Sequence, residues 1–162
     1  MDEEIKTGGK MPPIEKVYEA WSAIADGRVC IEPGSTDAEG KAEVESSSHE
    51  KTYTVAWRDG GRLFYSDDNS TYWRGYPGYP VIAVMMLEGL LPYNAKTAER
   101  YSGINWTEAN LRHRHNYAEA LREVEADRAI SHEEMEGKAR EVVDALAGSG
   151  IAVTRKRKPF GL

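Results

Sequence analysis

The sequence predicts an α+β fold: an N-terminal helix, a three- to four-stranded antiparallel β-meander, a buried apolar helix and two C-terminal helices. Three patterns support this: an apolar stripe at helical spacing, short alternating runs between turn residues, and helix-start signals late in the chain. We expect one domain over residues 11–153, with a flexible N-terminus at 1–10 and a basic tail at 154–162. Residues 11–92 are its helix–meander–helix part and 93–150 its C-terminal helical part.

The composition is that of a chain able to build an ordinary core. Of 162 residues, 40% are hydrophobic, which suffices for a core without disulfides or metal. The formal net charge of -6 disfavours non-specific binding to DNA or to anionic membranes. No signal peptide opens the sequence, and no apolar run approaches the roughly 18 residues that span a bilayer, so we expect a cytoplasmic protein without membrane contact.

The first helix is expected within "MPPIEKVYEAWSAIADG". Pro12 and Pro13 suit its first turn, and Gly27 suits the position just after its end. The apolar residues fall on one face: Ile14, Val17, Tyr18, Trp21, Ile24 and Ala25.

The meander is predicted from "RVCIE", "KAEVES", "KTYTVAWR" and "RLFYS", whose middle members alternate apolar and polar residues. Asp59, Gly60 and Gly61 give a strong hairpin signal between the last two strands. The single cysteine, Cys30, is expected to be a small buried hydrophobe, because free cysteines are usually buried.

The segment "PVIAVMMLEGLL" predicts a helix that is apolar nearly all round and therefore buried on most sides. We expect Val84 and Leu87 among its core residues. A fully buried side chain of this kind contributes roughly 1.5–3 kcal/mol before entropy is subtracted. This helix should be the energetic centre of the fold.

Two C-terminal helices are expected. The first is predicted to start at the N-cap Thr107 and to run through "TEANLRHRHNYAEALREVEADR", with Leu111 in its apolar stripe. The second starts at Ser131, which forms a capping box with Glu134, while Ile130 and Met135 are placed for a hydrophobic staple. The last segment, "IAVTRKRKPFGL", has room for a short strand before the basic tail.

No sequence pattern predicts a metal or a cofactor. His113 and His115 are two residues apart, which on a helix separates them by about 200°, so they cannot bind one ion together. We expect them on a solvated helix surface, and His132 as an exposed first-turn residue. One cysteine cannot form a zinc cluster, and no nucleophile elbow, P-loop or dinucleotide fingerprint is present.

Asp67 and Asp68 precede Asn69 and Ser70. Such a run is typical of a turn that hydrogen-bonds its own backbone. The alternative is a carboxylate pair of a small enzyme, working with a histidine that folding brings close. A cleft joining these groups, or a strongly perturbed carboxylate there, would favour the enzyme.

Aromatic residues and one arginine follow. We predict a partner-binding loop, because tyrosine, tryptophan and arginine are enriched at interface hot spots. Its residues are Tyr72, Trp73, Arg74, Tyr76 and Tyr79. The alternative is that they cap the meander and pack on its outer face. The tail offers a candidate phosphate-binding patch, or only a solvated terminus, in Arg155, Lys156, Arg157 and Lys158.

The region from Tyr53 to Leu87 resembles a SWIM zinc finger, a β-hairpin followed by an apolar helix with a Cys-x-Cys and a Cys-x-His ligand pair. "YTVAWRDGGRLFYSDD" is similar to the hairpin and "PGYPVIAVMM" to the segment with the last two ligands. The comparison places Phe64, Ser66, Gly78 and Pro80 at the ligand positions, and none of them binds zinc. The resemblance implies a metal-independent unit whose family binds DNA or protein.

These patterns lead us to expect a non-catalytic interaction module that binds protein in preference to nucleic acid, because the chain is acidic. A flat aromatic patch without a cleft would favour this hypothesis. The small enzyme using Asp67 and Asp68 is the first alternative. A self-associating structural protein is the second.

Overall fold

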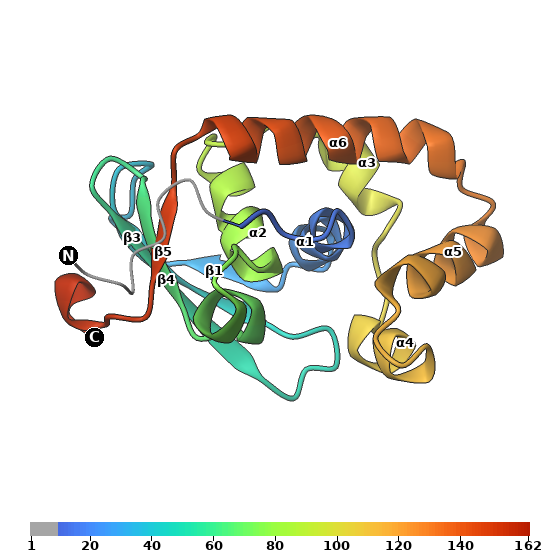
Figure 1. Ribbon diagram of the computed structural model, residues 1–162, viewed down its shortest axis with the longest axis horizontal. Coiled ribbons are helices and arrows are strands. Elements are labelled where there is room, and N and C mark those ends of the chain that lie inside the picture. The colour runs from blue at the N-terminus through green and yellow to red at the C-terminus, as the bar shows by residue number, and fades with distance from the viewer. Residues whose placement is uncertain (1–9) are drawn as a thin grey trace.

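The computed structural model describes residues 10–162 and has the predicted α+β fold, so the expected flexible N-terminus lies almost wholly outside the described residues (Figure 1). The strands are β1 (Val29–Ile31), β2 (Gly40–Glu45), β3 (Thr52–Arg58), β4 (Leu63–Ser66) and β5 (Ala152–Thr154). The helices are α1 (Glu15–Ala25), α2 (Tyr79–Leu87), α3 (Ala95–Glu99), α4 (Trp106–Arg112), α5 (Tyr117–Arg128) and α6 (His132–Gly148), with a π-helix η1 (Ser70–Arg74) and a 3₁₀-helix η2 (Lys158–Phe160).

The sheet has the order β1-β2-β3-β4-β5. Its first four strands form the predicted antiparallel meander, and the β3–β4 turn has positive φ at Asp59, Gly60 and Gly61, which confirms the hairpin signal. The fifth strand pairs in parallel with β4, with Leu63 opposite Ala152. The sheet therefore joins the middle of the chain to its C-terminal end.

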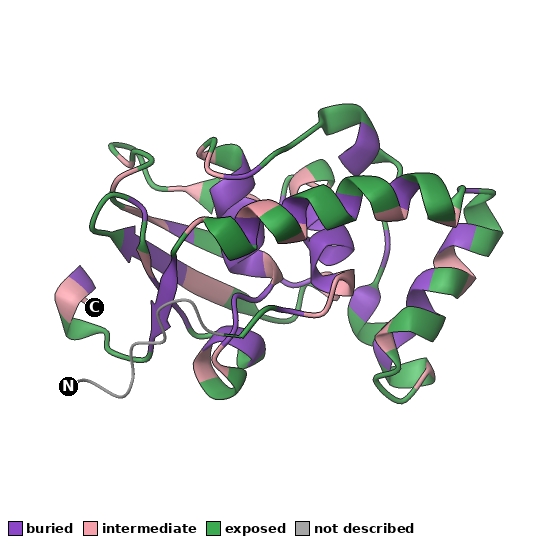
Figure 2. Cartoon of the chain, turned by 45° about the horizontal axis from the view of Figure 1, so that its top comes forward, coloured by how far each residue is buried: buried purple, intermediate pink, exposed green. Residues whose placement is uncertain are grey.

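The main core lies between one face of the sheet and α1 and α2, while α6 runs past both helices to reach α5 (Figure 1). Burial is concentrated at this centre, and the α4–α5 end is largely exposed (Figure 2). In α2, every side chain from Pro80 to Met86 is buried. The helix ends at Leu87, which is 40% exposed, so the expectation that Leu87 belongs to the core is wrong.

Cys30 is exposed, contrary to its expected burial. It lies on the edge strand β1, where Val29 and Ile31 pack against the core cluster. Successive side chains of a strand point to opposite faces, so Cys30 faces outward.

The first predicted C-terminal helix is two helices. Arg114 and His115 have φ values of 53° and 64°, which interrupt the helix between α4 and α5. The N-cap is Asn105, whose side chain accepts from Glu108 N, and it replaces the expected Thr107. Leu111 is 61% exposed because α4 buries the face that carries Trp106, Ala109 and Asn110.

The second predicted helix begins as expected, with Ser131 accepting from Glu134 N at 3.4 Å. Short α3 is an additional helix, capped by Asn94. In residues 10–162, no helix combines the length and apolar content that crossing a membrane requires.

The expected basic tail is partly folded. Thr154 belongs to β5, and Phe160 is buried on the outer sheet face against Tyr65 and Ala56. The ring centroids of Tyr65 and Phe160 are 6.2 Å apart. Sequence reasoning weighed the charges of this segment and gave no weight to its one aromatic residue.

Candidate functional site: a polar pocket beside the π-helix

A polar pocket of about 450 Å³ opens between α1, the β2–β3 turn, η1 and the α4–α5 region. It is unusual because several of its charged or polar side chains are buried. Besides Ser46 and Ser70, they are Lys16 and Glu19 on α1, Arg28 after α1, Asp68 before η1, and Asn110 on α4. Buried polar groups normally have hydrogen-bond partners, so each of these needs an account.

Lys16 and Glu19 form an ion pair at 3.4 Å, one turn apart on α1, and are only 7% and 5% exposed. Burial is the largest single influence on the pKa of Lys16 and lowers it, but Glu19, Tyr117 and Tyr76 together outweigh burial, so the pKa of Lys16 is raised. The ammonium also lies 4.3 Å from the centre of the Tyr117 ring. The lysine is therefore held charged inside the pocket wall.

Arg28 is held at two of its three nitrogens. Nη1 donates to the carbonyl of Glu45 at 2.6 Å, and Nε lies 3.4 Å from Asp26 Oδ2. Nη2 is buried and has no direct hydrogen-bond partner among the described residues. Leaving such a donor unsatisfied costs roughly 1–3 kcal/mol, more where the group is charged. The Tyr79 side chain also interacts with the Arg28 guanidinium, which opposes the rise that burial causes in the Tyr79 pKa.

Asn110 presents a second unsatisfied atom. Its Nδ2 donates to Glu19 Oε2 at 3.4 Å, which fixes the orientation of the amide. Its Oδ1 is buried and finds no partner within residues 10–162. The wall thus contains one bare donor, on Arg28, and one bare acceptor, on Asn110.

Asp68 caps the π-helix. Thr71 donates to it twice, from Oγ1 at 2.7 Å and from the backbone N at 3.1 Å. Burial raises the pKa of Asp68, and the hydrogen bonds from Ser66 and Thr71 oppose that rise. The turn interpretation of this segment is confirmed. Asp67 is exposed and accepts from Thr54 N, so the two acids do not act as a pair.

Gly78 allows this arrangement. Its N donates to Thr71 Oγ1 at 2.9 Å, and a Cβ at this position would lie 2.0 Å from Asp68 Oδ2. Only glycine fits so close to a fixed carboxylate. Hydrogen bonds from Gly78 to Thr71 and from Thr71 to Asp68 therefore hold the loop between η1 and α2 in place.

The five predicted partner-binding residues divide into separate groups. Arg74 and Tyr79 line the pocket, and burial raises the pKa of Tyr79. Tyr76 is buried. Tyr72 and Trp73 lie outside the pocket, and Trp73 is 66% exposed.

Tyr72 and Trp73 meet the predicted phosphate-binding segment. The Arg155 guanidinium lies 5.5 and 5.3 Å from their ring centres, and its Nε donates to the Tyr72 carbonyl at 2.7 Å. We call Tyr72, Trp73 and Arg155 the aromatic–arginine surface.

The other three tail residues of the predicted patch, Lys156, Arg157 and Lys158, are exposed. The Arg157 guanidinium lies 5.9 Å from the Tyr65 ring centre, and Lys158 begins η2.

The histidines occupy different surroundings. His115 lines the pocket that also contains Asp68. His113 lies 2.9 Å from Glu123, and His132 is part-buried between Glu125 and Glu136, so its expected exposure is wrong. In the described part of the chain, no three histidine, cysteine or acidic side chains are grouped to hold a metal ion.

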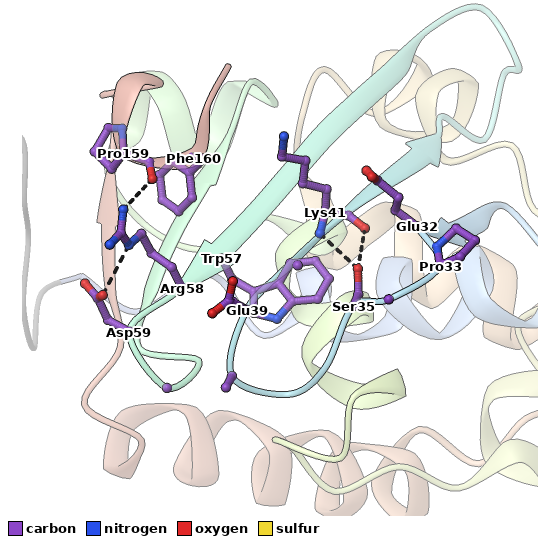
Figure 3. Close-up of a pocket in the computed structure, with 14 residues that line it drawn as sticks. Glu32, Pro33, Ser35, Glu39, Lys41, Trp57, Arg58, Asp59, Pro159 and Phe160 are labelled. Atoms are coloured by element: carbon purple, nitrogen blue, oxygen red, sulfur yellow. Dashed lines mark hydrogen bonds and ion pairs between the residues drawn. The ribbon is translucent and has the colours of Figure 1, made fainter.

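A second hollow, of about 560 Å³, lies beside the β1–β2 loop and η2 (Figure 3). Its polar groups are used within the loops: Ser35 Oγ bonds the backbone of Lys41, and Trp57 Nε1 donates to the Thr36 carbonyl at 2.8 Å. Arg58 pairs with Asp59 and donates to the Pro159 carbonyl. None of the bare buried atoms of residues 10–162 belongs to this hollow.

Sequence reasoning missed the principal pocket residues. Lys16, Glu19, Arg28 and Asn110 were not considered as site residues. The available signal was weak: Lys16 and Glu19 lie one turn apart in a helix whose residues Lys16 to Ala23 are all buried.

A family model described as "Uncharacterised conserved protein UCP014422" matches residues 9–152. Comparisons with curated proteins and with solved structures give no match. The matched range contains every residue of the polar pocket and ends before Arg155.

Proposed function

The chain belongs to the family of Uncharacterised conserved protein UCP014422, and we propose that the polar pocket of this chain binds a small anionic molecule. The excess of cationic side chains in the pocket lining, Arg28 among them, carries the proposal. A guanidinium in a pocket wall is suited to a carboxylate or phosphate group.

The charge of the lining supports an anion. Lys16 and Arg28 lie in the wall, and Lys51 and Arg74 are exposed lining residues. The lining carboxylates are those of Glu19 and Asp68. Four cations therefore face two acids in a protein whose net charge is -6. This local reversal of sign favours anionic ligands.

The energetic cost of the pocket also supports binding. Desolvating each buried ion costs several kcal/mol, and an apolar pair of similar volume is often at least as stabilising. A volume of about 450 Å³ falls in the range of small-molecule sites. Stability alone does not account for this set of side chains, whereas an anionic ligand would offset the positive charge of the lining.

A thermal-shift titration with inorganic phosphate and with succinate tests the proposal. We expect the wild-type melting temperature to rise with at least one of these anions, and the rise to vanish in Arg28→Met. Arg62→Met is the matched control, because Arg62 is an exposed arginine outside the pocket. Equal shifts in all three proteins, or none with either anion, would contradict the proposal. Arg28→Lys, which keeps the charge, serves if Arg28→Met fails to fold.

The polar pocket is a cleft that contains both Asp68 and His115, and this observation favours the small-enzyme alternative. However, both oxygens of Asp68 accept from Thr71, and Asp67 is not part of the pocket lining. We therefore propose binding without assigning a reaction.

The protein-binding module is the second candidate, favoured by the exposure of Trp73 on the aromatic–arginine surface. Residues that are fixed before binding lose little entropy on association. Pull-down from native lysate, with and without nuclease, should lose its partner in Trp73→Ala with Arg74→Ala and keep it in Leu111→Ala, which truncates a similarly exposed residue elsewhere. Nuclease-sensitive capture would indicate nucleic acid instead, and a concentration-dependent size in solution would indicate self-association.

A further inference from the structure

We infer that the aromatic–arginine surface, extended by Arg157 and Lys158, binds a short acidic segment of a protein partner. The inference rests on the protein-binding module, the second candidate under the proposed function, and adds the chemistry of the partner. It does not involve the polar pocket.

Positive charge is concentrated at this surface. Residues 155–158 are four consecutive cations, and we call them the basic segment. The whole chain has a formal net charge of -6, so the rest of the chain is more acidic still. The side chains of Arg155, Arg157 and Lys158 are exposed. They give an acidic molecule one positive area, which attracts a negatively charged partner.

The basic segment is held in place at both ends. Arg155 follows β5, and its Nε donates to the Tyr72 carbonyl at 2.7 Å. At the other end, Phe160 is buried on the outer sheet face, and Arg58 donates to the Pro159 carbonyl. These contacts position the cations before a partner arrives, so little entropy is lost on binding.

The setting of Arg155 suits a carboxylate. Its guanidinium lies over the Tyr72 and Trp73 rings, while its Nε is fixed by the Tyr72 carbonyl. A planar guanidinium stacked on aromatic rings presents its other N–H groups as a fork that matches the two oxygens of a carboxylate. Trp73 is 66% exposed and adds apolar area beside this fork. An acidic side chain next to an apolar one therefore fits both features.

The same contacts favour an acidic peptide over a nucleic acid strand. Single strands bind largely through bases that stack on aromatic rings. Here Arg155 lies over the Trp73 ring, and the Tyr72 ring packs against it with centroids 4.9 Å apart, so a stacking base would compete with both. A strand is also charged along its whole length, and the acidic remainder of the chain repels any part that extends beyond the basic segment. A short acidic peptide meets neither obstacle.

Fluorescence anisotropy with labelled probes tests the inference. The probe is the peptide Glu-Glu-Leu-Glu-Glu-Leu, its uncharged match is Gln-Gln-Leu-Gln-Gln-Leu, and hexathymidylate represents single-stranded nucleic acid. At low salt we expect the glutamate peptide to bind at least about tenfold more tightly than the glutamine peptide, with a difference that shrinks as salt is added. Hexathymidylate should bind more weakly than the glutamate peptide.

Trp73 reports where the peptide binds. Trp21, Trp57 and Trp106 are at most 3% exposed, whereas Trp73 is 66% exposed. Acrylamide should therefore quench mainly the fluorescence of Trp73, and bound glutamate peptide should reduce that quenching. Binding that leaves the quenching unchanged would place the peptide elsewhere and overturn the inference.

Arg155→Gln with Arg157→Gln should reduce the preference for glutamate over glutamine to near unity. Arg114→Gln with Arg122→Gln is the matched control, because it removes the same charge from two exposed arginines of the α4–α5 region, and it should keep the preference. The comparison of peptides on the wild-type protein needs no variant, so the inference stays testable even if the first variant does not fold.

Equal binding of the two peptides, a preference that survives Arg155→Gln with Arg157→Gln, or tighter binding of hexathymidylate would overturn the inference. If the acidic peptide fails while the pull-down still loses its partner in Trp73→Ala with Arg74→Ala, the protein-binding module stands and the acidic character of its partner is wrong. If the pull-down captures no partner either, the module itself is wrong. The thermal shifts with phosphate and succinate depend on Arg28, so the anion pocket is tested separately.

Discussion

Helix α2 and the wall of the polar pocket are both buried, but α2 is made of apolar side chains and the pocket wall contains charged and amide side chains. In α2, a run of apolar side chains from Pro80 to Met86 packs into the core, and burial itself is the stabilising contribution. In the pocket, charged and amide side chains are similarly hidden from water, but Arg28 and Asn110 retain bare polar atoms. Burial therefore stabilises the fold at α2, whereas it lowers the stability of the fold at Arg28 and Asn110.

The difference teaches where to look for function in this fold. A buried apolar residue is explained once its packing is described. A buried polar residue is explained only when its hydrogen bonds are complete, because an unsatisfied group lowers stability. Asp68 meets that condition through Thr71, whereas Arg28 and Asn110 do not.

The largest expected effect tests the apolar side of the comparison. Ile82→Ala removes a fully buried α2 side chain and should lower the free energy of unfolding by roughly 2–5 kcal/mol. Leu87→Ala, at the exposed end of the same helix, is the control and should cost about 1 kcal/mol or less. Denaturant melts that give the two variants similar losses would contradict the packing described here.

The next effect tests the polar side. Glu19→Ala leaves Lys16 as an uncompensated buried charge and should cost about 3 kcal/mol. Replacing both, in Lys16→Met with Glu19→Leu, should recover most of that stability. Chemical denaturation measures both variants. A double variant that is no more stable than Glu19→Ala would mean that the ion pair itself stabilises the fold.

A smaller effect concerns the junction of the two regions, where Gly78 precedes α2 and touches Asp68. Gly78→Ala places a Cβ against Asp68 Oδ2 and should cost about 1–3 kcal/mol through overpacking. Gly137→Ala on α6 meets nothing within 4 Å and should stabilise by up to about 1 kcal/mol, because alanine favours helix. If the melting temperatures of Gly78→Ala and Gly137→Ala shift in the same direction, the close contact between Gly78 and Asp68 does not explain the effect.

The smallest effect is a pH dependence from Asp68. Its pKa is raised by burial, so the folded state retains a proton that the unfolded state loses above the ordinary aspartate value of 3.8. The resulting contribution to stability is full below that value and is lost as pH rises through the folded pKa. The difference in unfolding free energy between wild type and Asp68→Asn should therefore fall with rising pH in that range. A difference that rises with pH would assign Asp68 a lowered pKa.

The sequence by itself determined the features that depend on near neighbours. The hairpin at Asp59 to Gly61, the capping box at Ser131 and the buried apolar run of α2 each follow from residues a few positions apart. Local patterns specify these elements because turn geometry, capping and helical periodicity are short-range. The same approach joined α4 to α5, because no residue type there marks the positive φ of Arg114 and His115.

Only the tertiary structure decided the pocket and the aromatic–arginine surface. Asn110 reaches Glu19 across 91 positions of sequence, and Arg155 reaches Tyr72 across 83. The first contact depends on how α4 lies against α1, where Trp106 Nε1 also donates to Ser22 Oγ. The second depends on β5 pairing with β4. A charged residue on an amphipathic helix looks the same in sequence whether it faces water or another element. Its burial is set by what the rest of the chain places over it, and for Lys16, Glu19 and Arg28 that cover comes from distant segments.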